Sequence, residues 1–186
     1  MKKIFFTFSA ILFFGSVLCA TEMYVQPKVG LGFSYHSYNA LGLSGGLDFA
    51  WKVWENDRKA PGKMYAGADL GFQYWMPTRV YRSIVYDKWR RHMMTAPVKG
   101  YFSYEFKVDA GPLVYAGPFY TAGVSFDIEH HTYEHVSNET SFGPSFSSSF
   151  GGTLVFHNNW VLKQTFAWGF GRYGWNSFII EAGYRF

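Results

Sequence analysis

Basic and aromatic side chains are concentrated in one stretch of this chain, residues 77–97. Five of its residues are Lys or Arg against a single acidic residue, Asp87, and aromatic residues lie between them. Guanidinium groups grip phosphate in a two-pronged geometry, so the stretch can bind a phosphate-rich lipid head or another polyanion. A solvated basic loop is the alternative interpretation. The residues assigned to this candidate binding surface are Arg79, Arg82, Lys88, Trp89, Arg90 and Arg91.

A second polar stretch, residues 129–144, is rich in histidine and glutamate. In an extended chain His131 and His135 share a face and could chelate a metal, but their spacing matches no known ligand pattern. We therefore expect a hydrophilic loop without a metal site. This loop is acidic where residues 77–97 are basic, so the two could pair. Protonation of the histidines at mildly acidic pH would then weaken that pairing.

The same stretch contains His135-Val136-Ser137-Asn138. A histidine base beside a serine hydroxyl can activate it for attack on an ester. The pattern is short, and one of its four positions is variable. No thiol nucleophile is expected, because the only cysteine, Cys19, lies in an N-terminal segment that we expect to be removed. We predict that the chain is not an enzyme and carries no cofactor.

The N-terminus has the features of a secretory signal peptide. Two lysines precede an apolar run over residues 4–17, and Ala20 offers a cleavage site after a small residue. A lipid attached to Cys19 is the alternative, but Leu18 is bulkier than such signals require. We predict a signal peptide at residues 1–20 and a single domain at residues 21–186. Removing Lys2 and Lys3 lowers the net charge from +4 to +2, which argues against a nucleic-acid partner.

The rest of the chain reads as eight strands, because apolar residues alternate with other residues along eight segments. No segment is apolar for 18 uninterrupted residues, so no membrane-spanning helix is predicted. In the last segment Phe178, Ile180, Ala182, Tyr184 and Phe186 form one apolar row. The eight segments are residues 24–36, 41–54, 63–76, 98–108, 113–128, 145–156, 160–170 and 177–186.

Eleven charged residues inside these segments test that assignment, leaving out Lys63 at the very start of the third segment. All eleven fall on the face opposite the apolar row, and Gln164 is the only strongly polar residue on the apolar side. A Lys or Arg facing lipid at mid-membrane would cost about 2–4 kcal/mol, whereas a water-soluble sheet would expose its charges. Aromatic residues, 22% of the chain, suit girdles at the two membrane interfaces. The eleven are Lys28, Asp48, Lys52, Asp69, Lys99, Glu105, Lys107, Asp127, Lys163, Glu181 and Arg185.

We therefore predict an all-β fold, an eight-stranded antiparallel transmembrane β-barrel with up-and-down connections. Eight strands leave a lumen just wide enough to be filled by side chains, and the nearly balanced inward charges favour an ion-paired interior. Short turns are expected at residues 55–62, 109–112 and 157–159. Loops are expected at the opposite end, over residues 37–40, 77–97, 129–144 and 171–176.

The chain resembles the small eight-stranded bacterial outer-membrane proteins, of the OmpX and OmpA transmembrane-domain type, with OmpW-like and opacity-type proteins as cousins. The resemblance rests on Tyr184-Arg185-Phe186, on glycine-interleaved strands at residues 29–33 and 65–68, and on length. It implies the outer membrane as location and the barrel-assembly machinery as a partner that recognises Tyr184 and Phe186. As in OmpX-like proteins, the third and fourth strands could continue through residues 80–86 as a protruding sheet.

The resemblance implies the fold and not an activity. Because the barrel itself presents no site, we expect function to lie in the two long loops as a surface interaction role: adhesion, binding of host surface molecules, or binding of lipopolysaccharide and outer-membrane lipid. A purely structural barrel and an OmpW-like narrow channel for small hydrophobic molecules are the alternatives. Lipid A deacylases of the PagL type carry a His-x-Ser-Asn motif on the penultimate strand, whereas here it follows the fifth. Palmitoyltransferases of the PagP type need an N-terminal amphipathic helix, for which residues 21–26 leave no room. A monomer is expected.

Overall fold

The computed structural model describes residues 22–35, 40–56, 61–81, 88–133, 137–170 and 175–186. The expected signal peptide, residues 1–20, lies outside these ranges, and within them no helix is long and apolar enough to cross a membrane. The described chain forms eight β-strands. They are β1 (Met23–Ser34), β2 (Ala40–Asn56), β3 (Gly62–Tyr81), β4 (Lys88–Ala110), β5 (Leu113–Tyr133), β6 (Glu139–Phe156), β7 (Trp160–Phe170) and β8 (Trp175–Tyr184).

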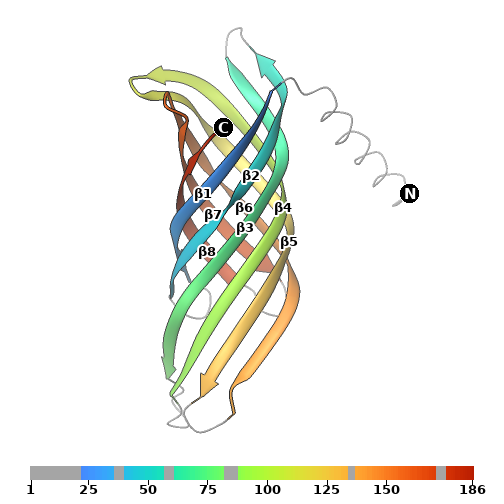
Figure 1. Ribbon diagram of the computed structural model, residues 1–186, viewed down its shortest axis with the longest axis vertical. Helices are drawn as coiled ribbons and strands as arrows, with labels where there is room; N and C mark the ends of the chain where they lie inside the picture. The colour runs from blue at the N-terminus through green and yellow to red at the C-terminus, as the bar shows by residue number, and fades with distance from the viewer. Residues whose placement is uncertain (1–21, 36–39, 57–60, 82–87, 134–136, 171–174) are drawn as a thin grey trace, which may run out of the picture.

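The eight strands close into a barrel (Figure 1). Each strand pairs antiparallel with the next one along the chain, and β1 pairs with β8, for example Leu31 opposite Ile180. Closure removes the free edges that an open sheet would present. The predicted fold class, an eight-stranded antiparallel up-and-down barrel, is confirmed.

Side chains alternate between the lumen and the outer surface, as the period-two pattern predicts. On β1 the Lys28 side chain is buried in the lumen, while Val29 and Leu31 are about two-thirds exposed on the outside. Lys107 is on the predicted face but outside the lumen. It lies at the end of β4, exposed, and pairs with Asp109 at 3.0 Å.

Tight turns join strands at the barrel end that carries Glu22 and Phe186, which we call the terminal end. β4 and β5 are joined through Gly111 and Pro112, and β6 and β7 through residues 157–159, as predicted. Asp109, Gly111 and Asn159 have φ values of 48°, 61° and 64°. These left-handed conformations suit glycine, asparagine and aspartate. Of the third predicted turn, residues 57–60 lie outside the described ranges.

The two long loops predicted at the other end are wrong. Within residues 77–97, β3 continues to Tyr81 and β4 begins at Lys88; within residues 129–144, β5 continues to Tyr133 and β6 begins at Glu139. The ladder hydrogen bonds continue beyond the apolar band because neighbouring strands support one another, and charged side chains are no obstacle where water replaces lipid. The suggested protruding sheet is therefore present up to these strand ends, while residues 82–87 and 134–136 lie outside the described ranges.

The outer apolar row also shifts on β2. A register shift between Lys52 and Trp54 places Trp54, rather than the predicted Val53, opposite Met64. A β-bulge of this kind inserts one residue and reverses the faces of those that follow. Trp54 is exposed and lies beside Tyr104, with ring centroids 6.1 Å apart.

Candidate functional site

A sheet of four strands projects from the end of the barrel opposite the termini, at the bottom of Figure 1. The last β2 partner of β3 is Gly42, opposite Trp75, and the last β7 partner of β6 is Phe170, opposite Phe146. Beyond these pairs, in the described part of the chain, β3, β4, β5 and β6 remain hydrogen-bonded to one another. We call this region the extension.

The basic residues predicted as a binding surface lie on the first two strands of the extension. Arg79 on β3 is directly opposite Arg90 on β4, and the next pair on the same face, toward the strand ends, is Tyr81 with Lys88. Trp89 and Arg91 occupy the alternating positions of β4, and the Arg90 side chain is exposed. The ladder thus places Arg79, Lys88 and Arg90 at positions of one face and Trp89 and Arg91 at positions of the other, while Arg82 lies outside the described ranges.

Histidines continue this surface toward the barrel. His92 and His130 are direct partners on β4 and β5, with ring centroids 6.1 Å apart. Nδ1 of His92 lies 3.3 Å from the Tyr74 hydroxyl, and Nδ1 of His130 lies 2.7 Å from the Thr140 hydroxyl. The sequence analysis did not assign His92 or Tyr74 to the surface. The sequence does contain a signal for His92. It lies two residues before Met94, which faces outward on β4, so the alternation of the strand puts His92 on the same outer face.

Acidic residues lie on the other face of the same strands. Asp127 and Glu129 are buried in the lumen, and each Asp127 oxygen accepts a 2.6 Å hydrogen bond from a serine, Ser125 or Ser145. Glu129 contacts His131 Nε2 at 3.2 Å. Alternation places Glu129 on the inner face, away from Arg90, and the predicted pairing of the basic and acidic stretches stays a prediction.

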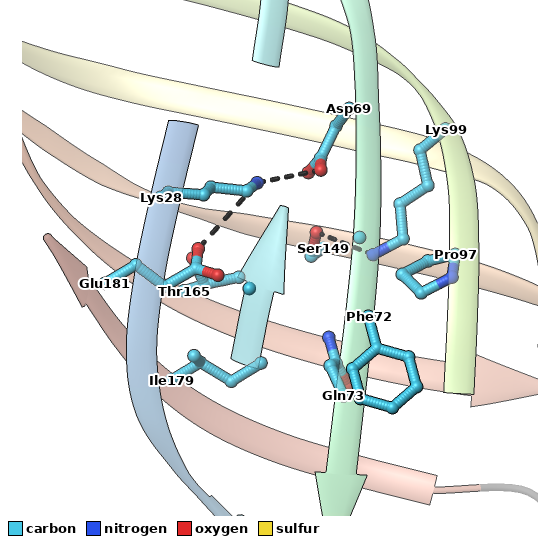
Figure 2. Close-up of a pocket in the computed structure, with 12 residues that line it drawn as sticks. Lys28, Asp69, Phe72, Gln73, Pro97, Lys99, Ser149, Thr165, Ile179 and Glu181 are labelled. Carbon is cyan, nitrogen blue, oxygen red and sulfur yellow. Dashed lines mark hydrogen bonds and ion pairs between the residues drawn. The ribbon is translucent and has the colours of Figure 1, made fainter. Parts of the chain in front are cut away.

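The middle of the lumen is filled by an ion-paired cluster, as the charge balance predicted. Lys28 Nζ lies 2.8 Å from both Asp48 and Asp69, and Lys163 Nζ lies 2.7 Å from Asp48. Figure 2 shows Lys28 between Asp69 and Glu181. These groups come from β1, β2, β3, β7 and β8, so they tie opposite sides of the barrel together.

A small cavity remains next to this cluster (Figure 2). It encloses about 20 Å³, which is room for one or two water molecules. Lys99 Nζ reaches the Ser149 hydroxyl at 3.3 Å there, and the hydroxyl of Thr165 has no partner among the described residues. Ordered water would satisfy both groups.

Two further layers narrow the lumen. Toward the terminal end, Arg185 donates to both Glu105 oxygens, at 3.0 and 2.8 Å, and its guanidinium lies 3.8 Å from the centroid of the Tyr24 ring. Toward the extension, the Trp75 indole lies against Gly42, where a Cβ would overlap the ring. Glycine on β2 is what makes room for this tryptophan inside an eight-stranded lumen.

The predicted assembly signal, Tyr184 and Phe186, lies on the outer surface at the seam of the barrel. Their rings pack edge to face with centroids 4.9 Å apart, and Tyr184 packs on Trp160 at 5.7 Å. The Phe186 amide donates to the Val25 carbonyl at 3.0 Å, so the last residue joins β1 although β8 ends at Tyr184. Recognition by the assembly machinery stays a prediction.

The remaining catalytic and metal candidates belong to the stretch around the end of β5 and the start of β6. His135 is outside the described ranges; Ser137 and Asn138 are exposed, and the Asn138 carboxamide accepts a 3.2 Å hydrogen bond from the Tyr133 amide. Asn138 therefore closes the chain reversal. In the described part of the chain no three His, Cys, Asp or Glu residues are grouped as a metal site would require.

No protein-family model and no curated protein matches this chain. Its fold is shared with solved outer-membrane barrels. Ail, the attachment invasion locus protein of Yersinia pestis, superposes with a TM-score of 0.55 at 14% identity, over 89% of this chain and 100% of Ail. The outer-membrane enzyme PagL gives 0.51 at 17% identity, over 87% and 98%. At such identities the likeness shows the fold: this chain has the fold of the small eight-stranded outer-membrane β-barrels.

Proposed function

We propose that the protein is a bacterial outer-membrane barrel whose extension binds phosphate-bearing or sulfated polyanions on its outer face. The pairing of Arg79 with Arg90 carries the proposal. Like charges directly opposite each other destabilise a ladder, and a bound anion would offset that repulsion. The described outer face holds no carboxylate to do so, since Glu129 and Glu139 occupy positions of the inner face.

The position of this face favours the phosphates of lipopolysaccharide as the anion. The strands that carry Arg90 and His130 run directly out of the lipid-facing rows, where Met94 and Ile128 are exposed. The outer face of the extension therefore begins where the lipid heads of the outer leaflet lie. Protonated His92 and His130 would add positive charge at that level.

A sulfated polyanion outside the cell is the second candidate. The Yersinia pestis protein Ail, which shares this fold, has been solved in complex with sucrose octasulfate, a heparin analogue. Sulfate and phosphate groups accept the same two-pronged hydrogen bonds from arginine. Adhesion to a host surface would follow from this chemistry.

Binding by the refolded barrel in detergent micelles separates these possibilities. We would compare the wild type with Arg79→Gln/Arg90→Gln, and with Lys107→Gln as a control at the terminal end. Each charge-assisted hydrogen bond contributes about 1.5–3 kcal/mol, so the double variant should bind lipopolysaccharide at least about tenfold more weakly. Lys107→Gln should bind as the wild type does. Heparin is the second probe. If the double variant loses binding to heparin but not to lipopolysaccharide, the second candidate is favoured. If it binds both as the wild type does, the barrel is purely structural.

We also propose that the barrel is neither an enzyme nor a channel for small hydrophobic molecules. Ser137 lies at the tip of the extension, away from the acyl chains that a deacylase must reach, and the lumen holds the charged groups of Lys28, Asp48 and Asp69. Lipid A from cells expressing the protein should keep its acyl pattern in mass spectra, and planar bilayers should show no large steady conductance. An acyl change abolished by Ser137→Ala, or a steady conductance, would contradict the proposal.

A further inference from the structure

One strongly polar side chain lies in the middle of the outer apolar surface. Gln164 on β7 is exposed between Leu162 and Phe166, with Trp160 and Phe170 marking the two ends of the same outward row. In a membrane this row faces lipid along its whole length. The Gln164 carboxamide, with two N–H donors and an oxygen acceptor, is therefore placed where no water can satisfy it.

Another polar side chain of an outward row meets this requirement within the barrel. Ser148 also belongs to an outward row, but its hydroxyl donates to the Tyr120 hydroxyl at 2.9 Å and reaches the Thr121 carbonyl at 3.2 Å. Gln164 has no hydrogen-bond partner among the described residues. Polar residues within a membrane span are costly unless paired, so they point to a partner outside the chain.

The strands beside Gln164 leave room for such a partner. Gly152 on β6 is its direct cross-strand neighbour, and a Cβ built there would meet nothing within 4 Å. The surface is therefore notched next to the carboxamide. Small residues beside a polar one are what allow two membrane-spanning elements to approach closely.

We infer that this face of β6 and β7 binds a second copy of the same chain, with the two Gln164 carboxamides hydrogen-bonded to each other. A carboxamide is both donor and acceptor, so it is complementary to itself across a two-fold axis, the commonest symmetry of homodimers. The sequence analysis expected a monomer, so the oligomeric state decides between that expectation and this inference. It rests on the membrane location and is independent of polyanion binding by the extension.

Disulfide cross-linking in native outer membranes tests the dimer, in a Cys19→Ala background so that the introduced cysteine is the only one. Leu162→Cys, two residues from Gln164 on the same outward row, should give a cross-linked homodimer while Gln164 itself remains. Leu70→Cys is the matched control, because it is also lipid-facing but lies on β3, on the other side of the barrel. Equal dimer yields at the two positions, or no dimer at position 162, would overturn the inference.

Two further variants separate pairing of carboxamides from mere proximity. Gln164→Leu should weaken dimerisation about three- to thirtyfold in detergent, the range that one hydrogen bond between membrane spans accounts for. Gly152→Leu should weaken it too, by filling the notch while Gln164 remains. Heat-modifiable migration on gels would confirm that each variant still forms a barrel. If both folded variants dimerise as the wild type does, or if the cysteine at position 162 cross-links to another protein instead of to a second copy, the inference is wrong.

Discussion

Asp48 is the residue on which the barrel interior depends most. Its carboxylate is fully buried and lies between two ammonium groups, 2.8 Å from Lys28 and 2.7 Å from Lys163. The three residues come from β1, β2 and β7, so the cluster holds non-adjacent strands together across the lumen. Burying these charges is tolerable only because they are paired.

Asp48→Ala should therefore lower the free energy of unfolding by about 3–5 kcal/mol, because it leaves two buried ammonium groups without their shared carboxylate. Urea titration of the barrel in lipid vesicles would measure the loss. Asp109→Ala is the control. It removes the exposed partner of Lys107, and an exposed pair contributes only about 0–1 kcal/mol. Equal losses in the two variants would show that the lumen cluster contributes no more than a surface pair.

Glu22 at the terminal end offers a test by pH. Partial burial acts to raise the pKa of its carboxyl, but the hydrogen bond from Lys52, at 2.9 Å, and the charge of Lys63 outweigh it, so the pKa is lowered. A lowered folded pKa stabilises the barrel above the pKa of the unfolded carboxyl, and this stabilisation is lost as pH falls through the folded pKa. Glu22→Gln should reduce the acid-dependent loss of stability below about pH 4.3. If the free energy of unfolding of Glu22→Gln falls between neutral pH and pH 3 as much as that of the wild type does, the prediction is wrong.

At the scale of the element, the sequence predicted the part of each strand that lies inside the membrane. It did not predict the residue at which the strand ends. Lipid forces apolar residues outward, so the outward rows, such as Val29 and Leu31 on β1, are visible in the sequence. Beyond the membrane nothing imposes alternation between apolar and polar residues. Polar residues such as His130 and Glu129 then resemble a loop although they continue β5.

Contacts between residues far apart in the chain could not be predicted from the sequence either. The opposition of Arg79 and Arg90 follows from the β3–β4 register, which shifts between Trp75 and Thr78. A period-two pattern fixes faces but does not reveal such shifts. The packing of Trp75 on Gly42 likewise depends on which strands are neighbours. The basic composition of the surface could be read from sequence, whereas its geometry required the fold.

The extension should be a folded sheet with two open edges, and hydrogen exchange would show it. Amides in the centre of the β4–β5 ladder, around His92 and His130, should exchange slowly. No described strand pairs with the outer edge of β3 from Thr78 to Tyr81 or of β6 before Phe146, so the amides there that point away from the sheet should exchange fast. NMR of the barrel in micelles resolves the two classes. Uniformly fast exchange across the extension would mean that these residues form loops.

At the scale of the whole molecule, the barrel separates three environments with one period-two pattern. Apolar residues meet lipid, ion pairs fill the lumen, and basic residues continue onto the outer face of the extension. The short turns and both described chain ends lie at one end of the barrel, and the extension lies at the other. Polyanion binding requires that the extension face the cell exterior, so orientation is the central claim.

Cysteine labelling of intact cells tests that claim most directly. Ser137→Cys at the tip of the extension, and His157→Cys in the β6–β7 turn, are both exposed positions at opposite ends. In a Cys19→Ala background, a maleimide that cannot cross membranes should label position 137 on intact cells. Position 157 should be labelled only after the outer membrane is permeabilised. Labelling of position 157 but not 137 on intact cells, or recovery of the protein in the soluble fraction, would contradict the account.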